Sequence, residues 1–220
     1  MKLDPRLHAV ADEIARLGVE VHADIGSDHA RLPLYLLQQN IVQKIIAVEK
    51  HQQPFERSVK ALRGVDADVR LGDGLEPLHP GETDSLSMSG MGAPLMVRIL
   101  RRSPQKVPEH LVLQPNANAE SLRCWALQNG YHLTNEQMVA GFWRYTVLMF
   151  SRKPGHDKAY DDVPRDLALR YGPLLLKRKH SLLLEELQHQ RHCLAKIAGG
   201  SAAEPRNALA TVERALEFVT

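Results

Sequence analysis

Three acidic residues, each at or just beyond the end of an apolar run, are the residues whose types and spacing indicate chemistry in this chain. Asp24 ends a β-like run, Glu49 ends the next apolar run, and Asp73 lies between two glycines. In a doubly wound parallel sheet, consecutive strands end side by side at one edge, so one nucleoside can contact all three acids. There Glu49 would accept hydrogen bonds from the ribose hydroxyls, and Asp73 from the exocyclic amine of an adenine. Any one of these acids, taken singly, could instead end a strand or cap a helix.

The turn after Asp24 narrows the class of cofactor. Residues 24–30 read DIGSDHA, so Gly26 is the only glycine in a turn where the dinucleotide fingerprint G-x-G-x-x-G needs three. Ser27 and Asp28 stand where a second glycine is expected. The turn therefore disfavours a hydride-transfer cofactor.

Two further strand ends carry residues suited to a ligand. Residues 89–92 (SGMG) follow the fourth expected strand, where glycines let another molecule approach the backbone, although an ordinary tight turn has the same composition. Residues 114–116 (QPN) follow the fifth, and their two side-chain amides can read the edge of a base. Asn116 is also a candidate cap for the helix that follows.

The elements that must position these residues alternate between apolar β-like runs and amphipathic helices. Strands are expected at 19–24, 45–48, 69–71, 85–89 and 111–113, and helices at 4–17, 32–39, 54–62, 93–102 and 119–128. This alternation predicts an α/β fold with a doubly wound sheet. The runs 131–139 and 143–150 have no helix between them, so they predict a closing antiparallel hairpin, an ending typical of methyltransferases rather than dehydrogenases.

A second, helical unit is expected after the sheet. Glycine, proline and aspartate interrupt the pattern at 153–155 and 161–164, which indicates a boundary, so we divide the chain into residues 1–153 and 154–220. Positions 176, 180, 183, 187, 190, 194 and 197 step by alternating fours and threes, which is coiled-coil spacing. Residues 199–201 (GGS) break this helix and Pro205 restarts it, so an antiparallel helical hairpin is predicted.

Composition sets the broad class. A chain of 220 residues with 44% hydrophobic and 25% charged residues is typical of a soluble protein with a sizeable core. Residues 1–17 contain neither a signal peptide nor a membrane span, so we expect a cytoplasmic protein. The two cysteines and eleven histidines show no metal-ligand spacing, so no metal is expected. A net charge of +2 neither demands nor excludes a nucleic-acid partner.

Four motifs, which occur in the expected order along the sequence, resemble those of a known protein family. Residues 24–33 (DIGSDHARLP), 70–75 (RLGDGL), 89–92 (SGMG) and 113–116 (LQPN) resemble those of the TrmK family, bacterial tRNA (adenine-N1)-methyltransferases acting at position 22. The resemblance implies a class I, Rossmann-like S-adenosylmethionine fold with a C-terminal coiled coil. The chain departs from the family's pattern at Arg31, at Ala93 and across residues 139–144, positions expected to face the acceptor rather than the methyl donor.

The resemblance, together with the motifs, assigns candidate residues. Cofactor binding is expected from Asp24, Gly26, Ser27, Asp28, Glu49, Lys50, Gly72, Asp73, Gly74, Ser89, Gly90 and Met91. The implied reaction is methyl transfer to adenine N1, whose lone pair needs no base, and the candidates for stabilising the cationic product or taking its N6 proton are Asp28, His29 and Asn116. Contacts to tRNA phosphates are expected from Arg31, Arg98, Arg101, Arg102, Lys177, Arg178 and Lys179.

Two alternatives to this function stay open. The departures permit a methyltransferase with a different RNA or small-molecule acceptor, and the chain could also be an RNA-binding relative that has lost catalysis. A monomer is expected, with a dimer through the C-terminal helices as the alternative.

Overall fold

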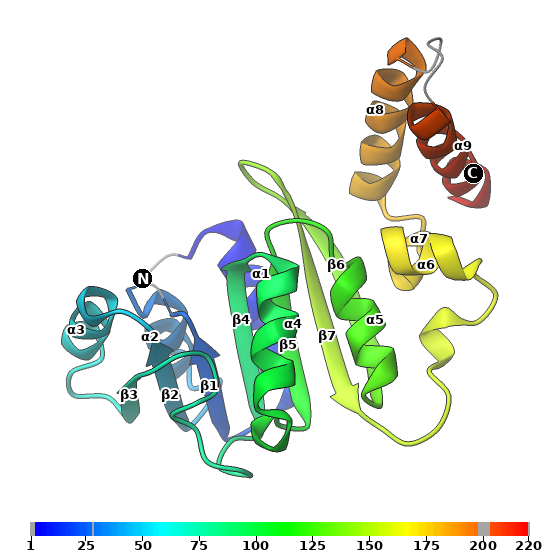
Figure 1. The fold of residues 1–220 in the computed structure, drawn as a ribbon. Helices are drawn as coiled ribbons and strands as arrows, with labels where there is room; N and C mark the ends of the chain where they lie inside the picture. Colours follow the sequence, from blue (N-terminus) through cyan, green and yellow to red (C-terminus); the bar gives the residue numbers. More distant parts are fainter. Residues whose placement is uncertain (1–2, 28, 198–202, 220) are drawn as a thin grey trace.

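The computed structural model describes residues 3–27, 29–197 and 203–219, and their centre is a seven-stranded sheet (Figure 1). The strand order is β3-β2-β1-β4-β5-β7-β6, and β7 runs opposite to both of its neighbours. The strands are β1 (Val21–Ile25), β2 (Lys44–Glu49), β3 (Ala67–Leu71), β4 (Ser85–Met91), β5 (His110–Pro115), β6 (Tyr131–Ala140) and β7 (Arg144–Arg152). The predicted doubly wound sheet with a closing antiparallel hairpin is therefore confirmed.

Helices cover both faces of this sheet (Figure 1). The first five are α1 (Pro5–Leu17), α2 (Arg31–Gln38), α3 (Gln52–Ala61), α4 (Ala93–Arg102) and α5 (Glu120–Gln128). Alternate residues of one strand point to opposite faces, so Ile45 and Ala47 join the hydrophobic core with α1 and α2, whereas Ile46 and Val48 join the core with α4 and α5. The run 45–48 is thus buried on both faces, as predicted.

The start of α1 follows from its sequence. The Asp4 carboxylate accepts a hydrogen bond from the Leu7 amide at 2.9 Å, and Pro5 occupies the first helical position, where its missing N–H costs nothing. Gly18 ends the helix at φ 62°, a conformation that glycine adopts without strain. This fixed start holds the first turn of α1, with Arg6, at one edge of the sheet.

After β7 the described residues form four α-helices, α6 (Arg165–Tyr171), α7 (Pro173–Lys177), α8 (Ser181–Ile197) and α9 (Ala203–Val219). The first two pack on α5 and β6, and α8 and α9 form an antiparallel hairpin that projects from the body (Figure 1). The predicted helical hairpin is confirmed, but its heptad is shorter than expected. Lys179 has φ 48°, which interrupts the helix, so positions 176 and 180 lie outside α8. The predicted glycine break at 199–201 lies outside the described residues.

A buried ion pair fastens α6 and α7 to the sheet. The Arg123 guanidinium of α5 contacts the Glu136 carboxylate of β6 at 2.6 Å, and both side chains are buried. Arg123 also donates to the Leu169 carbonyl oxygen, and Glu136 accepts from the Leu175 amide. A Cβ at Gly172, whose φ is 101°, would collide with the Glu136 carboxylate, so this joint requires glycine.

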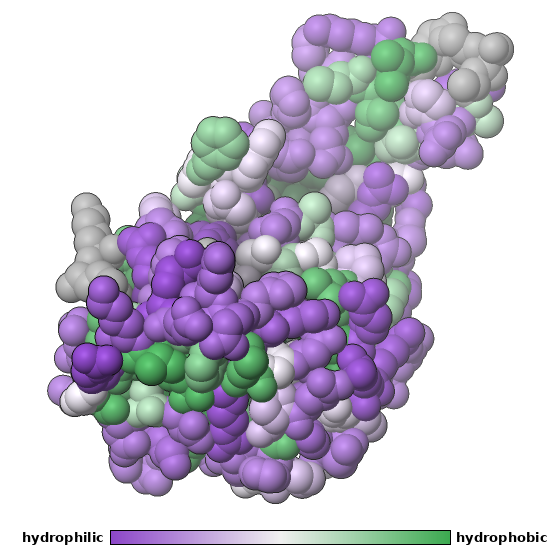
Figure 2. All heavy atoms as spheres, turned by 60° about the vertical axis from the view of Figure 1, so that its left-hand side comes forward, coloured by the Kyte–Doolittle hydropathy of each residue, from purple (hydrophilic) through white to green (hydrophobic). Residues whose placement is uncertain are grey.

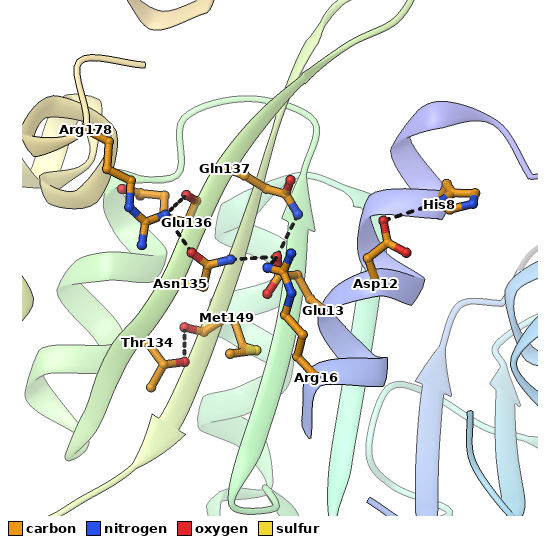
Figure 3. A network of polar contacts seen from close by, with 10 residues as sticks. All are labelled: His8, Asp12, Glu13, Arg16, Thr134, Asn135, Glu136, Gln137, Met149 and Arg178. Atoms are coloured by element: carbon orange, nitrogen blue, oxygen red, sulfur yellow. Dashed lines mark hydrogen bonds and ion pairs between the residues drawn. The ribbon is translucent and has the colours of Figure 1, made fainter. Parts of the chain in front are cut away.

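A second polar network links α1, β6 and the tail (Figure 3). The buried Glu13 carboxylate of α1 accepts hydrogen bonds from the side-chain amides of Asn135 and Gln137, each at 2.7 Å. Asn135 in turn accepts from the Arg178 guanidinium at 2.7 Å. Burial raises the pKa of Glu13, whereas the Arg16 guanidinium and the Asn135 amide oppose that shift.

Candidate functional site

The three acids singled out in the sequence lie at or just beyond the ends of three neighbouring strands. Asp24 lies in β1, Glu49 ends β2, and Asp73 comes two residues after β3. The parallel register pairs Ile25 with Val48 and Glu49 with Leu71, so all three strands end at one edge, as predicted. The side chains differ in exposure, because Asp24 and Glu49 are buried whereas Asp73 is 35% exposed.

The Asp24 carboxylate is held by two hydroxyl groups. Its oxygens accept hydrogen bonds from Ser27 of the following turn and Ser87 of β4, both at 2.6 Å. Burial raises the pKa of Asp24, and the two donors act in the opposite direction. The residue therefore presents a fixed carboxyl group rather than a mobile one.

Behind Asp24 lies a buried histidine that the sequence reading did not identify. His22 Nε2 is 2.9 Å from Ser87 Oγ, and His22 Nδ1 is 2.7 Å from Ser85 Oγ. Because the single Ser87 proton goes to Asp24, its oxygen must accept from His22 Nε2–H, which leaves Nδ1 to accept from Ser85. Burial lowers the pKa of His22 to about 3, so the ring is neutral. The sequence signal that could have identified His22 is the alternation of side chains along a strand, which places residues 22 and 24 on one face of their strand and residues 85 and 87 on one face of theirs.

Glu49 and Asp73 have different partners. The Glu49 carboxylate accepts from Ser58 Oγ of α3 at 3.2 Å. Asp73 lies 3.0 Å from Lys50 Nζ and 3.3 Å from the Arg102 guanidinium, and the hydrogen bond from Lys50 lowers its pKa. Arg102 also contacts Glu76 at 2.6 Å. Asp73 is thus an ionised group. It pairs with both Lys50, which was expected to bind the cofactor, and Arg102, which was expected to bind the RNA.

A cavity of about 450 Å³ opens at this edge of the sheet, and we call it the strand-end cavity. The predicted site residues that line it are Asp24, Gly26, Ser27, His29, Arg31, Ser89, Gly90, Met91 and Asn116. Glu49, Lys50, Gly72, Asp73 and Gly74 do not line it but follow the next two strands. Asp28, a predicted cofactor and catalytic residue, lies outside the described residues.

Two glycines are required where the walls approach each other. Gly26 has φ 76°, and a Cβ there would collide with the methyl group of Met91. Gly90 has φ 71°, and a Cβ there would lie 2.9 Å from the Arg6 guanidinium. A side chain at either position would therefore strain the backbone and intrude on the cavity wall.

A hydrogen-bonded cluster across β4 and β5 forms the opposite wall. Gln114 Oε1 accepts from Arg6 at 2.8 Å and from the Gly90 amide at 3.0 Å, and Asn116 Nδ2 donates to the Gly90 carbonyl oxygen at 2.8 Å. The buried Gln114 is therefore a structural residue and does not present its amide to a base. The alternative that Asn116 caps the next helix is wrong, since no side-chain hydrogen bond caps α5.

Arg6 and Tyr145 belong to this wall although the sequence reading did not assign them to the site. The Arg6 guanidinium lies 5.7 Å from the centre of the Tyr145 ring, and both residues line the strand-end cavity. No spacing pattern relates these residues, because one lies in the first turn of α1 and the other in β7.

The strand-end cavity fits a polar small molecule. Ser89 lines it, and the Oγ atom of this residue is buried and has no hydrogen-bond partner among the described residues. A ligand hydrogen-bonding group would satisfy this atom. The volume falls in the range of about 300–1,000 Å³ of small-molecule sites. The buried Asp24 carboxylate in its lining suits a ligand with hydroxyl or amine donors.

The cations predicted to bind RNA fall into separate groups. Arg31 lines the strand-end cavity, and Arg98 and Arg101 lie with Arg102 on α4. Lys177 Nζ donates to the Lys158 carbonyl oxygen at 3.3 Å, and Lys179 follows α7. Arg178 donates to Asn135 and to the Glu136 carbonyl oxygen, so it also supports the fold.

Two classes of feature are absent from residues 3–27, 29–197 and 203–219. None of the helices there is long and apolar enough to cross a membrane. No group of three or more histidine, cysteine, aspartate or glutamate side chains in these ranges is placed to hold a metal ion.

Comparison with known proteins gives a consistent result. The model of the TrmK family, described as tRNA (adenine(22)-N(1))-methyltransferase, matches residues 22–219. The tRNA (adenine(22)-N(1))-methyltransferase of Bacillus subtilis (strain 168) is 33% identical over 214 residues, which cover 93% of this chain and 89% of that protein.

Solved structures agree with this match. The crystal structure of the B. subtilis M1A22 tRNA methyltransferase TrmK superposes with a TM-score of 0.82 at 32% identity, covering 99% of this chain and 97% of that one. M. capricolum TrmK, solved with S-adenosyl-homocysteine, has a TM-score of 0.86 at 24% identity and covers all of both chains (100% each). At 24% identity, the likeness to the M. capricolum structure shows the fold alone.

Proposed function

Because this chain belongs to the TrmK family, we propose that it transfers a methyl group from S-adenosyl-L-methionine to N1 of adenine 22 in tRNA. The observation that carries this proposal is the extent of the family match. It runs from β1 to α9 and so includes every strand end of the site as well as the C-terminal helices.

The cofactor-binding residues are proposed from their places at the sheet edge. Glu49, buried at the end of β2, would accept hydrogen bonds from the ribose hydroxyl groups. Asp73, flanked by Gly72 and Gly74, would accept a hydrogen bond from the exocyclic amine of the adenine. Lys50 would hold Asp73 in place. Asp24, Gly26, Ser27 and Asp28 from the first turn, with Ser89, Gly90 and Met91, would surround the remainder of the cofactor.

The chemistry requires alignment more than proton transfer. When bound, S-adenosylmethionine would supply a methyl group on a sulfonium. The lone pair of adenine N1 would form the new N–C bond as the methyl–sulfur bond breaks and S-adenosylhomocysteine leaves. Methylation leaves a cationic ring, so a carboxylate or an amide oxygen nearby would stabilise it. His29 and Asn116 line the strand-end cavity and are our candidates there, with Asp28 from the same turn.

The remaining proposals concern the RNA and the chain as a whole. We assign phosphate contacts to Arg31, Arg98, Arg101, Arg102, Lys177, Arg178 and Lys179. Residues 1–153 would form the methyltransferase domain and 154–220 the helical domain, a division supported by the end of β7 at Arg152. We place the protein in the cytoplasm, where its tRNA would be found, acting as a monomer.

The decisive experiment is methylation in vitro. Unmodified tRNA is incubated with the full-length protein and S-adenosylmethionine, and its nucleosides are analysed by mass spectrometry. We expect 1-methyladenosine in tRNA with adenine at position 22 and none in a matched tRNA with guanine there. Cofactor binding without 1-methyladenosine at position 22 would contradict the proposal and favour a different acceptor. Failure to bind the cofactor would favour a non-catalytic RNA-binding protein.

A further inference from the structure

The three-residue loop between β6 and β7 carries two large aromatic side chains in solvent. Phe142 is 88% exposed and Trp143 is 67% exposed, and their rings meet edge to face at 5.2 Å. No other phenylalanine or tryptophan among the described residues is exposed. Adjacent exposed aromatic rings mark an interaction site, because leaving them in water is unfavourable.

The loop presents these rings on a rigid support. The pairing of β6 with β7 continues to Ala140 and Arg144, and the Gly141 amide donates to the Trp143 carbonyl oxygen at 2.9 Å. In Figure 1 this hairpin end extends beyond the other strands, at the same end of the sheet as α8 and α9. In Figure 2 a projection beside the C-terminal helices carries hydrophobic colour.

The loop forms one rim of a groove of about 1,140 Å³, and α8 forms the other. Asn116 and Tyr145 line both this groove and the strand-end cavity, so the groove continues into the proposed reaction site. The Arg144 guanidinium crosses to α8, where it meets Glu185 at 3.1 Å and Glu186 at 2.9 Å.

One residue of the groove lining has an unpartnered, buried hydroxyl group. Tyr171 lines the groove and is only 8% exposed, and its hydroxyl oxygen has no hydrogen-bond partner among the described residues. Burial raises the pKa of Tyr171, so the hydroxyl keeps its proton and can donate it. A ligand with hydrogen-bond acceptors fits this groove, and nucleobases and phosphates carry many.

We propose that Phe142 and Trp143 stack on an unpaired base of the RNA acceptor next to the target adenine, and that the groove holds the adjoining nucleotides. This inference rests on the proposed function. Adenine N1 lies on the Watson–Crick edge, so the target base must leave its stack, and its neighbour then loses a stacking partner. An aromatic ring replaces that partner whatever the base.

A base suits this rim better than a phosphate or a protein partner. Among residues 140–146 the only cation is Arg144, and its guanidinium pairs with Glu185 and Glu186, so the loop itself offers no unopposed positive charge to a phosphate. Two aromatic rings alone bury far less area than a stable protein–protein interface needs, whereas their size matches that of one nucleobase.

The test combines a variant with a spectroscopic probe. The double variant F142A/W143A is compared with F142Y/W143F, which keeps the rings, and with V65A, which trims a distant exposed residue. The tRNA carries 2-aminopurine at position 21 or 23, whose fluorescence falls on stacking. We expect the alanine variant to lose the protein-dependent quenching and to bind tRNA roughly tenfold more weakly, with unchanged cofactor affinity and melting temperature. Both control variants should match the wild type.

Two results would overturn the inference. In a wild-type protein that methylates adenine 22, unchanged quenching and tRNA affinity in F142A/W143A would remove the stacking role and leave the proposed function intact. A lower oligomeric mass in that variant with unchanged tRNA affinity would assign the rings to a contact between copies of the chain. Absence of methylation by the wild type is a separate result, which tests the proposed function.

Discussion

Glu49 is the single residue on which the proposed binding of the methyl donor depends most directly. It is buried, ends β2, and has Ser58 as a hydrogen-bond partner within the protein. For Glu49→Ala we expect cofactor affinity to fall by about 1–3 kcal/mol, the range for hydrogen bonds to a charged group. Calorimetric titration with S-adenosylmethionine measures this, with Glu56→Ala on the exposed side of α3 as the control. An unchanged dissociation constant in Glu49→Ala would refute the ribose role.

His22 allows a prediction about pH. Its pKa is about 3 in the folded protein, against 6.5 for an ordinary histidine. The unfolded chain therefore takes up a proton that the folded chain refuses, so stability falls as the pH drops from 6.5 toward 3. His22→Gln lacks this effect. The unfolding free energy of the wild type minus that of His22→Gln should therefore fall by about 2 kcal/mol when the pH is lowered from 6.5 to 5.

Denaturant titrations of both proteins at these two pH values measure that difference. Asp24 titrates in both proteins, so the comparison isolates the histidine to first order. A gap in unfolding free energy that stays constant with pH would mean that the ring is protonated in the folded state, and the hydrogen-bond directions assigned to Ser85 and Ser87 would then be wrong.

The joint between β6 and the first C-terminal helices depends on a buried charge pair. Arg123 and Glu136 are almost fully buried, and Gly172 leaves room for the carboxylate. Arg123→Met leaves Glu136 buried without its partner, so we expect a loss of about 3–5 kcal/mol in unfolding free energy. The double variant Arg123→Met/Glu136→Leu should recover much of this loss, because it buries no charge.

Chemical denaturation of the wild type, the two single variants and the double variant completes this cycle. Additive effects of the two substitutions would show that the residues do not act as a pair. Cofactor affinity should stay unchanged in every variant that folds, since neither residue lines the strand-end cavity.

At the scale of the whole molecule, we propose that the charged side of α4 binds the RNA near the proposed cofactor site. Arg102 is engaged by Asp73 and Glu76, so Arg98 and Arg101 are the more informative pair to change. For Arg98→Gln/Arg101→Gln we expect weaker tRNA binding. The slope of the logarithm of the binding constant against the logarithm of the salt concentration should become less steep by about one for each phosphate that is no longer neutralised. Arg57→Gln on α3 is the matched control. Binding of tRNA measured at several salt concentrations checks this, and an unchanged slope would exclude α4 from the interface.

The sequence alone was enough for the doubly wound sheet with its closing antiparallel hairpin and for the shared edge of the three acids. Hydrophobic alternation reports which faces of a strand are buried, and parallel strands in series must end on the same side. Asp24, Glu49 and the glycine turns could therefore be located before any contact was known. The two helices of the tail were visible for the same reason, since their apolar spacing is local.

Only the tertiary structure decided which distant side chains meet. Arg6 reaches Gln114 across 108 positions, His22 supports Asp24 through a serine of another strand, and the tail packs α6 and α7 into the same core as the sheet. The helix break at Lys179 and the internal use of Arg178 also depend on that packing. Local patterns record conformation and burial, whereas such pairs depend on how whole layers sit against one another, which no spacing along one chain contains.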